Sequence, residues 1–193
     1  MGEIVVLRHG QTEWSRSGQH TGVTDLPLLP EGEERARSLA SSLGARDFVD
    51  IRVSPRTRAR RTAELVGLTP TVIDDDLVEV DYGGYEGLTT PEISEKLGTT
   101  WSLWTLGTVP GDTPGESLGD VTARVDRVLH TVRPKLEEGD VALVAHGHVL
   151  RILTARWLRL APEQGALFPL GAGAYGVLGF EKGRTALTGW NVH

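Results

Sequence analysis

The sequence predicts an α/β domain in which helices cover both faces of a mainly parallel sheet. Two short aliphatic runs, IVVL at residues 4–7 and VALVA at residues 141–145, each lead into a histidine–glycine pair. Continuous apolar runs of this length are typical of interior strands that are buried on both faces. Segments with helical patterns separate the two runs, and alternating strands and helices predict a parallel sheet.

Three helices are expected between the two apolar runs. Residues 31–43 (EGEERARSLASSL) are rich in helix-forming residues and stop at a glycine. Residues 56–66 follow Ser54-Pro55, which is a helix-start signal with proline in the first turn. Residues 116–136 carry leucine and valine at helical spacing, so this stripe is predicted to face the core.

The C-terminal part of the chain completes the predicted sheet. A last helix is expected over residues 149–158, and residues 175–180 and 185–190 read as two strands of a hairpin joined by EKGR. Residues 107–115 (GTVPGDTPG) concentrate glycine and proline, so they are predicted to form a loop. We expect this loop to flank a site rather than to divide two domains.

Length and composition limit the classes of protein to consider. The 193 residues, 39% hydrophobic and 24% charged, fit one soluble globular domain over residues 1–193. No apolar run approaches the ~20 residues of a membrane helix, and no signal peptide is visible, so a cytoplasmic location is expected. The absence of cysteine excludes disulfides and cysteine-ligated metals. A net charge of −6 argues against nucleic acid or an anionic membrane as the main partner.

The residues at the ends of the two apolar runs predict a phosphoryl-binding pocket. Ligands of open α/β sheets bind outside the carboxyl ends of the strands. If the two strands are neighbours, Arg8 and His9 converge there with His146. A neutral histidine is a nucleophile near pH 7, and arginine offers a planar fork to phosphate oxygens. Backbone amides that follow Gly10 and Gly147 at helix N-termini add further donors to an anion.

A basic segment, SPRTRARRTAE, opens the second predicted helix. A solvated basic face explains Arg56, Arg60 and Arg61. Arg58 is distinguished from them only by its position in a motif.

Several motifs in this order resemble the histidine phosphatase superfamily, which includes the cofactor-dependent phosphoglycerate mutases. The motifs are LRHGQTEW, TGVTDLPL, SPRTRARRTA, the glutamate of EVDYGGYEG, PGES and VAHGHVLR, and they span residues 5–151. The resemblance implies the three-layer phosphoglycerate mutase-like fold. It also implies that His9 is the nucleophile that forms a phosphohistidine and that Glu79 is the general acid. Arg8, Arg58 and His146 would hold the phosphoryl oxygens.

The resemblance marks further residues of the expected pocket. Many relatives have asparagine where this chain has Ser15, which would make a shorter polar contact to the phosphate. Thr12 is a candidate for the pocket wall. Thr21 and Gly22 match a substrate-loop pair whose backbone can approach the ligand, and Gly147 lies beside His146. For Trp14, Trp101 and Trp104, packing is favoured over a place in the pocket wall.

No metal or cofactor is expected. Attack on phosphorus builds negative charge on three equatorial oxygens and on the departing oxygen. The two arginines supply the positive charge that Mg²⁺ supplies elsewhere. His146 and His148 could be taken for metal ligands, but residues two apart at a strand end are expected to diverge, and no third ligand is apparent.

Hydrolysis of small phosphate monoesters is the favoured function. A phosphoglycerate mutase must also bind a carboxylate and keep water from the phosphohistidine, and the mutases use a basic insertion after the glutamate for this. Here residues 80–115 contain Lys96 as their only cation. The segment also resembles a branch of broad acid and sugar phosphatases. We therefore expect a small phosphorylated metabolite as partner. Mutase activity is the alternative, a catalytically inactive phosphate-binding module is a remote one, and a homodimer remains open.

Overall fold

A six-stranded sheet forms the centre of the computed structural model, which describes residues 1–193. Its strand order is β3-β2-β4-β1-β5-β6. The first four strands in this order pair in parallel, and β5 and β6 form an antiparallel hairpin at one edge. The predicted α/β architecture with a mainly parallel sheet is therefore confirmed. The strands are β1 Ile4–Arg8, β2 Phe48–Val53, β3 Val72–Ile73, β4 Asp140–Ala145, β5 Tyr175–Glu181 and β6 Arg184–Val192.

Strands β1 and β4 are direct neighbours. The residues that follow them can converge only if the two strands lie side by side. Their parallel register places Arg8 opposite Ala145, and the amide of His9 donates to the carbonyl of Ala145 at 2.9 Å. The next residues, His9 and His146, therefore leave adjacent strands at the same height.

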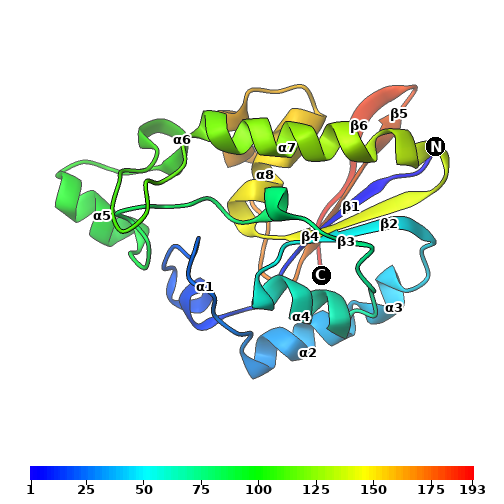
Figure 1. Ribbon diagram of the computed structural model, residues 1–193, viewed down its shortest axis with the longest axis horizontal. Helices are drawn as coiled ribbons and strands as arrows, with labels where there is room; N and C mark the ends of the chain where they lie inside the picture. The colour runs from blue at the N-terminus through cyan, green and yellow to red at the C-terminus, as the bar shows by residue number, and fades with distance from the viewer.

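Helices cover both faces of the sheet (Figure 1). One face packs against α7 and α8, and the opposite face packs against α2, α3 and α4. Alternate residues of β1 pack in the two cores: Ile4 and Val6 lie in the first, and Val5 and Leu7 lie in the second. The helices are α1 Glu13–Ser17, α2 Pro30–Ser38, α3 Ala40–Leu43, α4 Thr57–Leu65, α5 Thr90–Leu97, α6 Leu103–Leu106, α7 Leu118–Val132 and α8 Gly147–Trp157.

The short helices α1, α5 and α6 gather beyond the carboxyl ends of the parallel strands (Figure 1). They belong to the segments between β1 and α2 and between β3 and α7. This is the edge of the sheet at which an open α/β fold binds its ligands. None of the helices has both the length and the apolar character needed to cross a bilayer.

The structure differs from the sequence-based expectation in a few elements. The helix predicted over residues 31–43 is divided at Leu39 into α2 and α3. The long helix ends at Val132, and Pro134 begins a 3₁₀ turn there, because proline lacks the amide that would continue the α-helix. Strand β2 was not predicted, since its sequence FVDIRV is interrupted by two charged residues. Those residues are Asp50 and Arg52, which pair with each other at 2.8 Å.

The buried side chain of Arg124, on α7, fixes the segment that carries Glu79. The residue is 5% exposed, and its guanidinium donates to the carbonyls of Asp76 (2.8 Å), Val78 (2.6 Å) and Glu79 (3.2 Å). It also pairs with the carboxylate of Glu116 at 2.8 Å. One arginine thus satisfies three backbone carbonyls of a segment that has no sheet or helix partner of its own.

Replacing Arg124 by methionine is expected to destabilise the fold by about 3 kcal/mol, because it leaves buried carbonyls and the Glu116 carboxylate without their donor. Arg127→Met is the matched control: it lies one turn away, its side chain is 62% exposed, and it pairs with Asp76 at 2.6 Å. An exposed pair of this kind contributes at most about 1 kcal/mol. Urea unfolding of the two variants measures the difference, and equal losses would contradict the role of Arg124.

Candidate active site

A cavity of about 170 Å³ opens at the carboxyl ends of β1 and β4. Polar and charged side chains dominate its wall, with Tyr82 as the large aromatic residue. Six of the residues singled out from the sequence line this cavity, and four lie behind its wall. Those in the wall are Arg8, His9, Ser15, Thr21, Glu79 and Gly147. Those behind it are Thr12, Gly22, Arg58 and His146.

The imidazole of His9 is held in the tautomer that a nucleophile needs. Its Nδ1 lies 2.7 Å from the carbonyl oxygen of Gly10. A carbonyl can only accept, so Nδ1 carries the proton and Nε2 keeps its lone pair. Nε2 has no protein partner, and the ring lines the cavity. Burial, followed by the positive charges of Arg58 and Arg8, holds the pKa of His9 well below its ordinary value, so the ring is neutral at neutral pH.

His146 lies beside His9, with the two ring centroids 5.1 Å apart. Its Nδ1 accepts from Arg58 Nε at 3.2 Å, and its Nε2 therefore donates to the hydroxyl of Ser54 at 2.7 Å. The side chain is fully buried, and burial together with the neighbouring His9 and Arg58 lowers its pKa well below the ordinary value. Its direct contact with a phosphoryl group stays a prediction.

Arg8 presents a buried donor without a partner to the site. Its Nη1 donates to the carbonyl of Leu170 at 2.6 Å, whereas its Nε is buried and has no hydrogen-bond partner. A Cβ on Gly147 would lie 3.2 Å from the guanidinium carbon, so glycine lets Arg8 pack closely on the start of α8. An unpaired buried guanidinium N–H is costly, and an anion in the cavity would satisfy it.

Arg58 holds the loop that forms one side of the cavity. It is fully buried, and its guanidinium donates to the carbonyls of Thr24 (2.9 Å), Thr21 (3.2 Å) and Gly22 (3.3 Å). Its Nη1 also lies 3.6 Å from the carboxylate of Asp25. Arg58 therefore lies behind the cavity wall and supports it through His146 and through this loop. A direct contact of Arg58 with phosphate stays a prediction.

The carboxylate of Glu79 sits at the N-terminus of α8. Its two oxygens accept the amides of Val80, His148 and Val149, each at 2.9 Å. The last two amides belong to the first turn of α8, where an anion is favoured by unpaired N–H groups and by the helix dipole. Glu79 is 7% exposed and lines the cavity, so it faces the substrate from a fixed position.

Thr12 and Ser15 are one pair of predicted pocket residues, and Thr21 and Gly22 are another. In each pair, one residue lines the cavity and the other lies behind its wall. Thr12 is fully buried and caps α1: its hydroxyl accepts from the amide of Ser15, and the hydroxyl of Ser15 accepts from the amide of Thr12. The amide of Gly22 is bound by Glu86, and a Cβ on Gly22 would lie 2.2 Å from the carbonyl oxygen of Val80. This glycine is therefore needed for close backbone packing, while Thr21 beside it faces the cavity.

Six residues that sequence reasoning did not assign also line the cavity: Gly18, Gln19, His20, Tyr82, His148 and Arg151. Three of these belong to quoted motifs, EVDYGGYEG and VAHGHVLR, and Gly147 and Arg151 have the i, i+4 spacing that shares one helix face. Gln19 and His20 carry no local signal.

The imidazoles and the phenol in this part of the wall are neutral near pH 7. Burial lowers the pKa of His20 to about 4 and lowers that of His148 well below its ordinary value. Burial and the charge of Glu79 raise the pKa of Tyr82. The hydroxyl of Tyr82 lies 2.6 Å from Nδ1 of His148, so the two side chains fix each other.

No group of three or more histidine, aspartate and glutamate side chains has the arrangement of a metal site. His146 and His148 diverge as expected: the first bonds to Arg58 and Ser54, and the second to Tyr82.

The tryptophans and the glycine-rich loop lie outside the cavity wall. Trp101 is 3% exposed and donates to the carbonyl of Gly107 at 2.8 Å, whereas Trp14 packs near Gly87. Trp104 stands behind the wall, 5.3 Å from the ring of His148. The loop at residues 107–115 is tied to Asp81, which accepts from Gly115 N at 3.2 Å and from the hydroxyl of Thr113. It supports the segment after Glu79 without covering the cavity.

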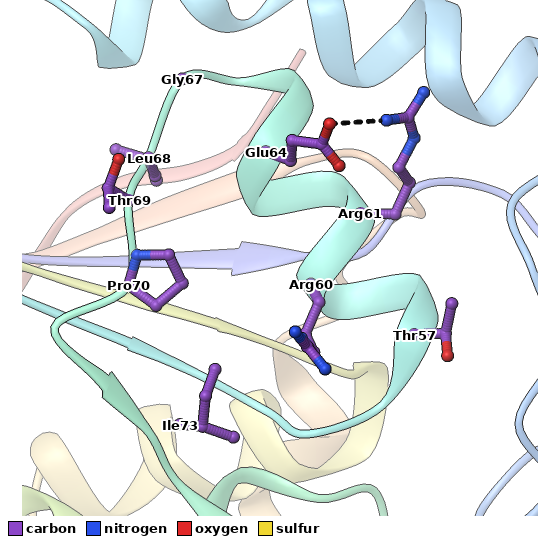
Figure 2. Close-up of a pocket in the computed structure, with 9 residues that line it drawn as sticks. All are labelled: Thr57, Arg60, Arg61, Glu64, Gly67, Leu68, Thr69, Pro70 and Ile73. Carbon is purple, nitrogen blue, oxygen red and sulfur yellow. Dashed lines mark ion pairs between the residues drawn. The ribbon is translucent and has the colours of Figure 1, made fainter.

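A larger hollow of about 500 Å³ lies elsewhere, between α4 and β3 (Figure 2). Arg60 and Arg61 border it, and Arg61 pairs with Glu64 at 2.9 Å, as the dashed line shows. None of the candidate catalytic residues reaches this hollow. Arg60 is exposed and Arg61 is partly exposed, as the predicted solvated basic face requires. Arg56, predicted for the same face, is instead partly buried, and its Nε has no hydrogen-bond partner.

Comparison with known proteins agrees with the geometry of the site. The sequence model of the histidine phosphatase superfamily (branch 1) matches residues 4–193. An acid phosphatase of Mycobacterium tuberculosis is 38% identical over 182 residues, which cover 93% of this chain and 87% of the relative. A sedoheptulose 1,7-bisphosphatase of Saccharomyces cerevisiae is 37% identical, over 83% of this chain and 69% of the relative.

Mutases and solved structures are also among the similar proteins. A 2,3-bisphosphoglycerate-dependent phosphoglycerate mutase of Cytophaga hutchinsonii is 33% identical, over 89% of this chain and 84% of the relative. The crystal structure of an open reading frame product of Mycobacterium tuberculosis superposes with a TM-score of 0.92 at 36% identity, covering 99% of this chain and 97% of that one. The chain belongs to the histidine phosphatase superfamily, in its branch 1.

Proposed function

We propose that the protein hydrolyses small phosphate monoesters through a phosphohistidine on His9, without a metal. The observation that carries the proposal is the tautomer of His9: the Gly10 carbonyl binds Nδ1–H and leaves the Nε2 lone pair open to the cavity. The unpaired Nε of Arg8 and the carboxylate of Glu79 border the same cavity. A nucleophile, an anion donor and an acid–base group therefore meet in one small space.

In the first step, Nε2 of His9 attacks phosphorus and the bond from phosphorus to the ester oxygen breaks. Arg8 stabilises the negative charge on the equatorial oxygens, and Arg58 and His146 reinforce it from behind. Glu79 delivers a proton to the departing alcohol oxygen. A phosphate group has a second pKa of about 6, so below neutral pH the substrate itself can bring that proton into the cavity.

In the second step, water attacks the phosphohistidine and the bond from Nε2 to phosphorus breaks. The Glu79 carboxylate takes the proton of the attacking water, and inorganic phosphate leaves. The amides of His148 and Val149 hold the carboxylate in place for both steps.

Hydrolysis is favoured over phosphoglycerate mutation. The relatives named as an acid phosphatase and a bisphosphatase are 38% and 37% identical, against 33%, 34% and 36% for three phosphoglycerate mutases. Residues 80–115 hold Lys96 as their only cation, and Lys96 is exposed on α5, outside the cavity. The basic insertion by which the mutases bind the carboxylate therefore has no counterpart in this segment. The cytoplasmic location stays a prediction, and a homodimer stays open.

Replacing His9 by alanine is expected to lower kcat on p-nitrophenyl phosphate by a factor of about 10⁴ or more, because the nucleophile is removed. His130→Ala is the control, since His130 is exposed on α7 and should leave the rate unchanged. Acid-labile labelling of the wild type by a ³²P-labelled substrate, absent in His9→Ala, would identify the intermediate. A variant that retains its activity would show that His9 is not the nucleophile.

The rate should be highest on the acidic side of neutrality. His9 reacts in its neutral form, and its lowered pKa keeps it neutral well below its ordinary titration range. The departing alcohol needs a proton, and the phosphate of the substrate, with a second pKa of about 6, carries fewer protons as the pH rises. Steady-state kcat/KM measured from about pH 4.5 to about pH 9 checks this. A steady rise toward the alkaline end would contradict it.

With 3-phosphoglycerate and catalytic 2,3-bisphosphoglycerate, we expect net release of inorganic phosphate and little 2-phosphoglycerate. Water reaches the phosphohistidine, because this chain lacks the apparatus that a mutase uses to exclude it. Phosphate release and enolase-coupled detection of 2-phosphoglycerate measure the two products in parallel. Rapid 2-phosphoglycerate formation without net phosphate release would establish the mutase instead.

A further inference from the structure

The cavity contains a second arginine, Arg151, which the mechanism above does not use. Arg151 lies on α8 and lines the same cavity as Arg8 and His9. Its Nε donates to the carbonyl of Gly165 and its Nη2 to that of Ala166, both at 3.0 Å. The guanidinium also stacks on Trp104, with its central carbon 4.7 Å from the ring centroid.

The support for this guanidinium is rigid. A Cβ on Gly165 would lie 2.7 Å from the ring of Trp104, so the backbone, the indole and the guanidinium pack tightly together. Two hydrogen bonds and one stacked face leave Arg151 little freedom to move. A planar cation fixed in this way has already lost the side-chain entropy that binding an anion would otherwise cost.

Arg151 makes no ion pair in the protein. Burial lowers its pKa, and the negative charge of Glu79 acts on it against this effect of burial. No carboxylate lies within ion-pair distance of it, whereas Arg156 on the same helix is held by both oxygens of Asp126, at 3.0 and 3.1 Å. Its remaining nitrogen, Nη1, makes no hydrogen bond, and the residue lines the cavity. The neighbouring His20, His148 and Tyr82 are neutral near pH 7, so none of them opposes or shares the charge.

The position of Arg151 separates it from the phosphoryl site. Arg8 packs on Gly147, and Arg151 follows Gly147 by four residues on the same helix face. Four residues of an α-helix rise about 6 Å. A phosphate bound by Arg8 and an anion bound by Arg151 would therefore occupy different parts of the same cavity.

We propose that Arg151 binds a second anionic group, a carboxylate or a phosphate, on the leaving alcohol. The preferred substrates are then compact phosphate monoesters with two anionic groups. This inference rests on the proposed hydrolysis and adds the substrate class to it. When His9 Nε2 bonds to phosphorus, the ester bond breaks and the alcohol departs with the proton from Glu79, still holding its second anion at Arg151.

Matched substrate pairs test the proposal. 3-Phosphoglycerate and glycerol 3-phosphate differ in a carboxylate, and fructose 1,6-bisphosphate and fructose 6-phosphate differ in a second phosphate. The wild type should have a kcat/KM higher by about 10-fold or more for the doubly anionic member of at least one pair, since a charge-assisted contact contributes about 1.5–3 kcal/mol. The pair that shows the preference identifies the anion as carboxylate or phosphate.

Arg151→Gln should lower kcat/KM for the preferred doubly anionic substrate by about 10- to 100-fold, mainly through KM. Its effect on glycerol 3-phosphate and p-nitrophenyl phosphate should stay within about threefold, because these lack the second anion. Arg151→Lys keeps the charge without the planar fork and should fall between the two. Arg156→Gln, on the same helix and paired with Asp126, is the control and should leave the substrate ratio unchanged.

Equal losses on all substrates in Arg151→Gln, or no wild-type preference in either pair, would overturn the proposal. If Arg151→Gln does not fold, the wild-type preference and the Arg151→Lys ratio decide. Failure of this inference is distinct from failure of the proposed function. A wild type that hydrolyses p-nitrophenyl phosphate but ignores the second anion refutes only the role of Arg151, whereas an inactive wild type refutes the hydrolysis itself.

Discussion

The parallel pairing of β1 with β4 is the constraint on which the rest of the site depends. The register places Arg8 opposite Ala145, so His9 and His146 leave neighbouring strands side by side, with ring centroids 5.1 Å apart. Both strands are buried on both faces, and a shift of one residue would move every apolar side chain to the wrong core. The burial that stabilises the sheet therefore also fixes the relative position of the two histidines. Helix α8 begins directly after His146 and brings its N-terminus to Glu79.

Burial gives the site its chemical character. Arginines that are removed from water keep their positive charge close to the imidazoles, and desolvation together with that charge keeps His9 and His146 neutral. The Gly10 carbonyl then selects the tautomer of His9. A nucleophile is thus maintained by its surroundings without a base beside it. The cost is a buried donor of Arg8 without a partner, which is the kind of local instability that an anion relieves.

The outer wall of the cavity is formed by other segments of the chain, and hydrogen bonds and aromatic stacking hold it in place. The segment after Glu79 is held by Arg124 and Asp81 through hydrogen bonds to its backbone and to the loop at residues 107–115. Aromatic and imidazole rings form a neutral surface, and Arg151 adds one charge that Trp104 and two carbonyls hold in place. The phosphoryl half of the cavity carries the motifs of the family, and, as we propose, the choice of leaving group lies in this second half. The sequence argument from a cation-poor segment at residues 80–115 was sound for that segment, but it did not include a cation supplied by α8.

Local patterns in the sequence predicted the α/β architecture, the two central strands and most of the covering helices. Strands that are buried on both faces give continuous apolar runs, and helices that pack on a core give apolar residues at helical spacing. Local patterns also singled out Arg8 and His9 at the end of the first strand, and the family resemblance added Glu79. The division of α2 from α3 and the strand β2, whose charged residues pair with each other, depended on tertiary contacts. The positions of Arg58 and His146 behind the cavity wall also depended on tertiary contacts, as did the positions of Gln19, His20 and Arg151 in the wall. These residues meet only when separate segments pack together, and no local pattern records a contact such as the one between Arg58 and His146, which lie 88 residues apart in the chain.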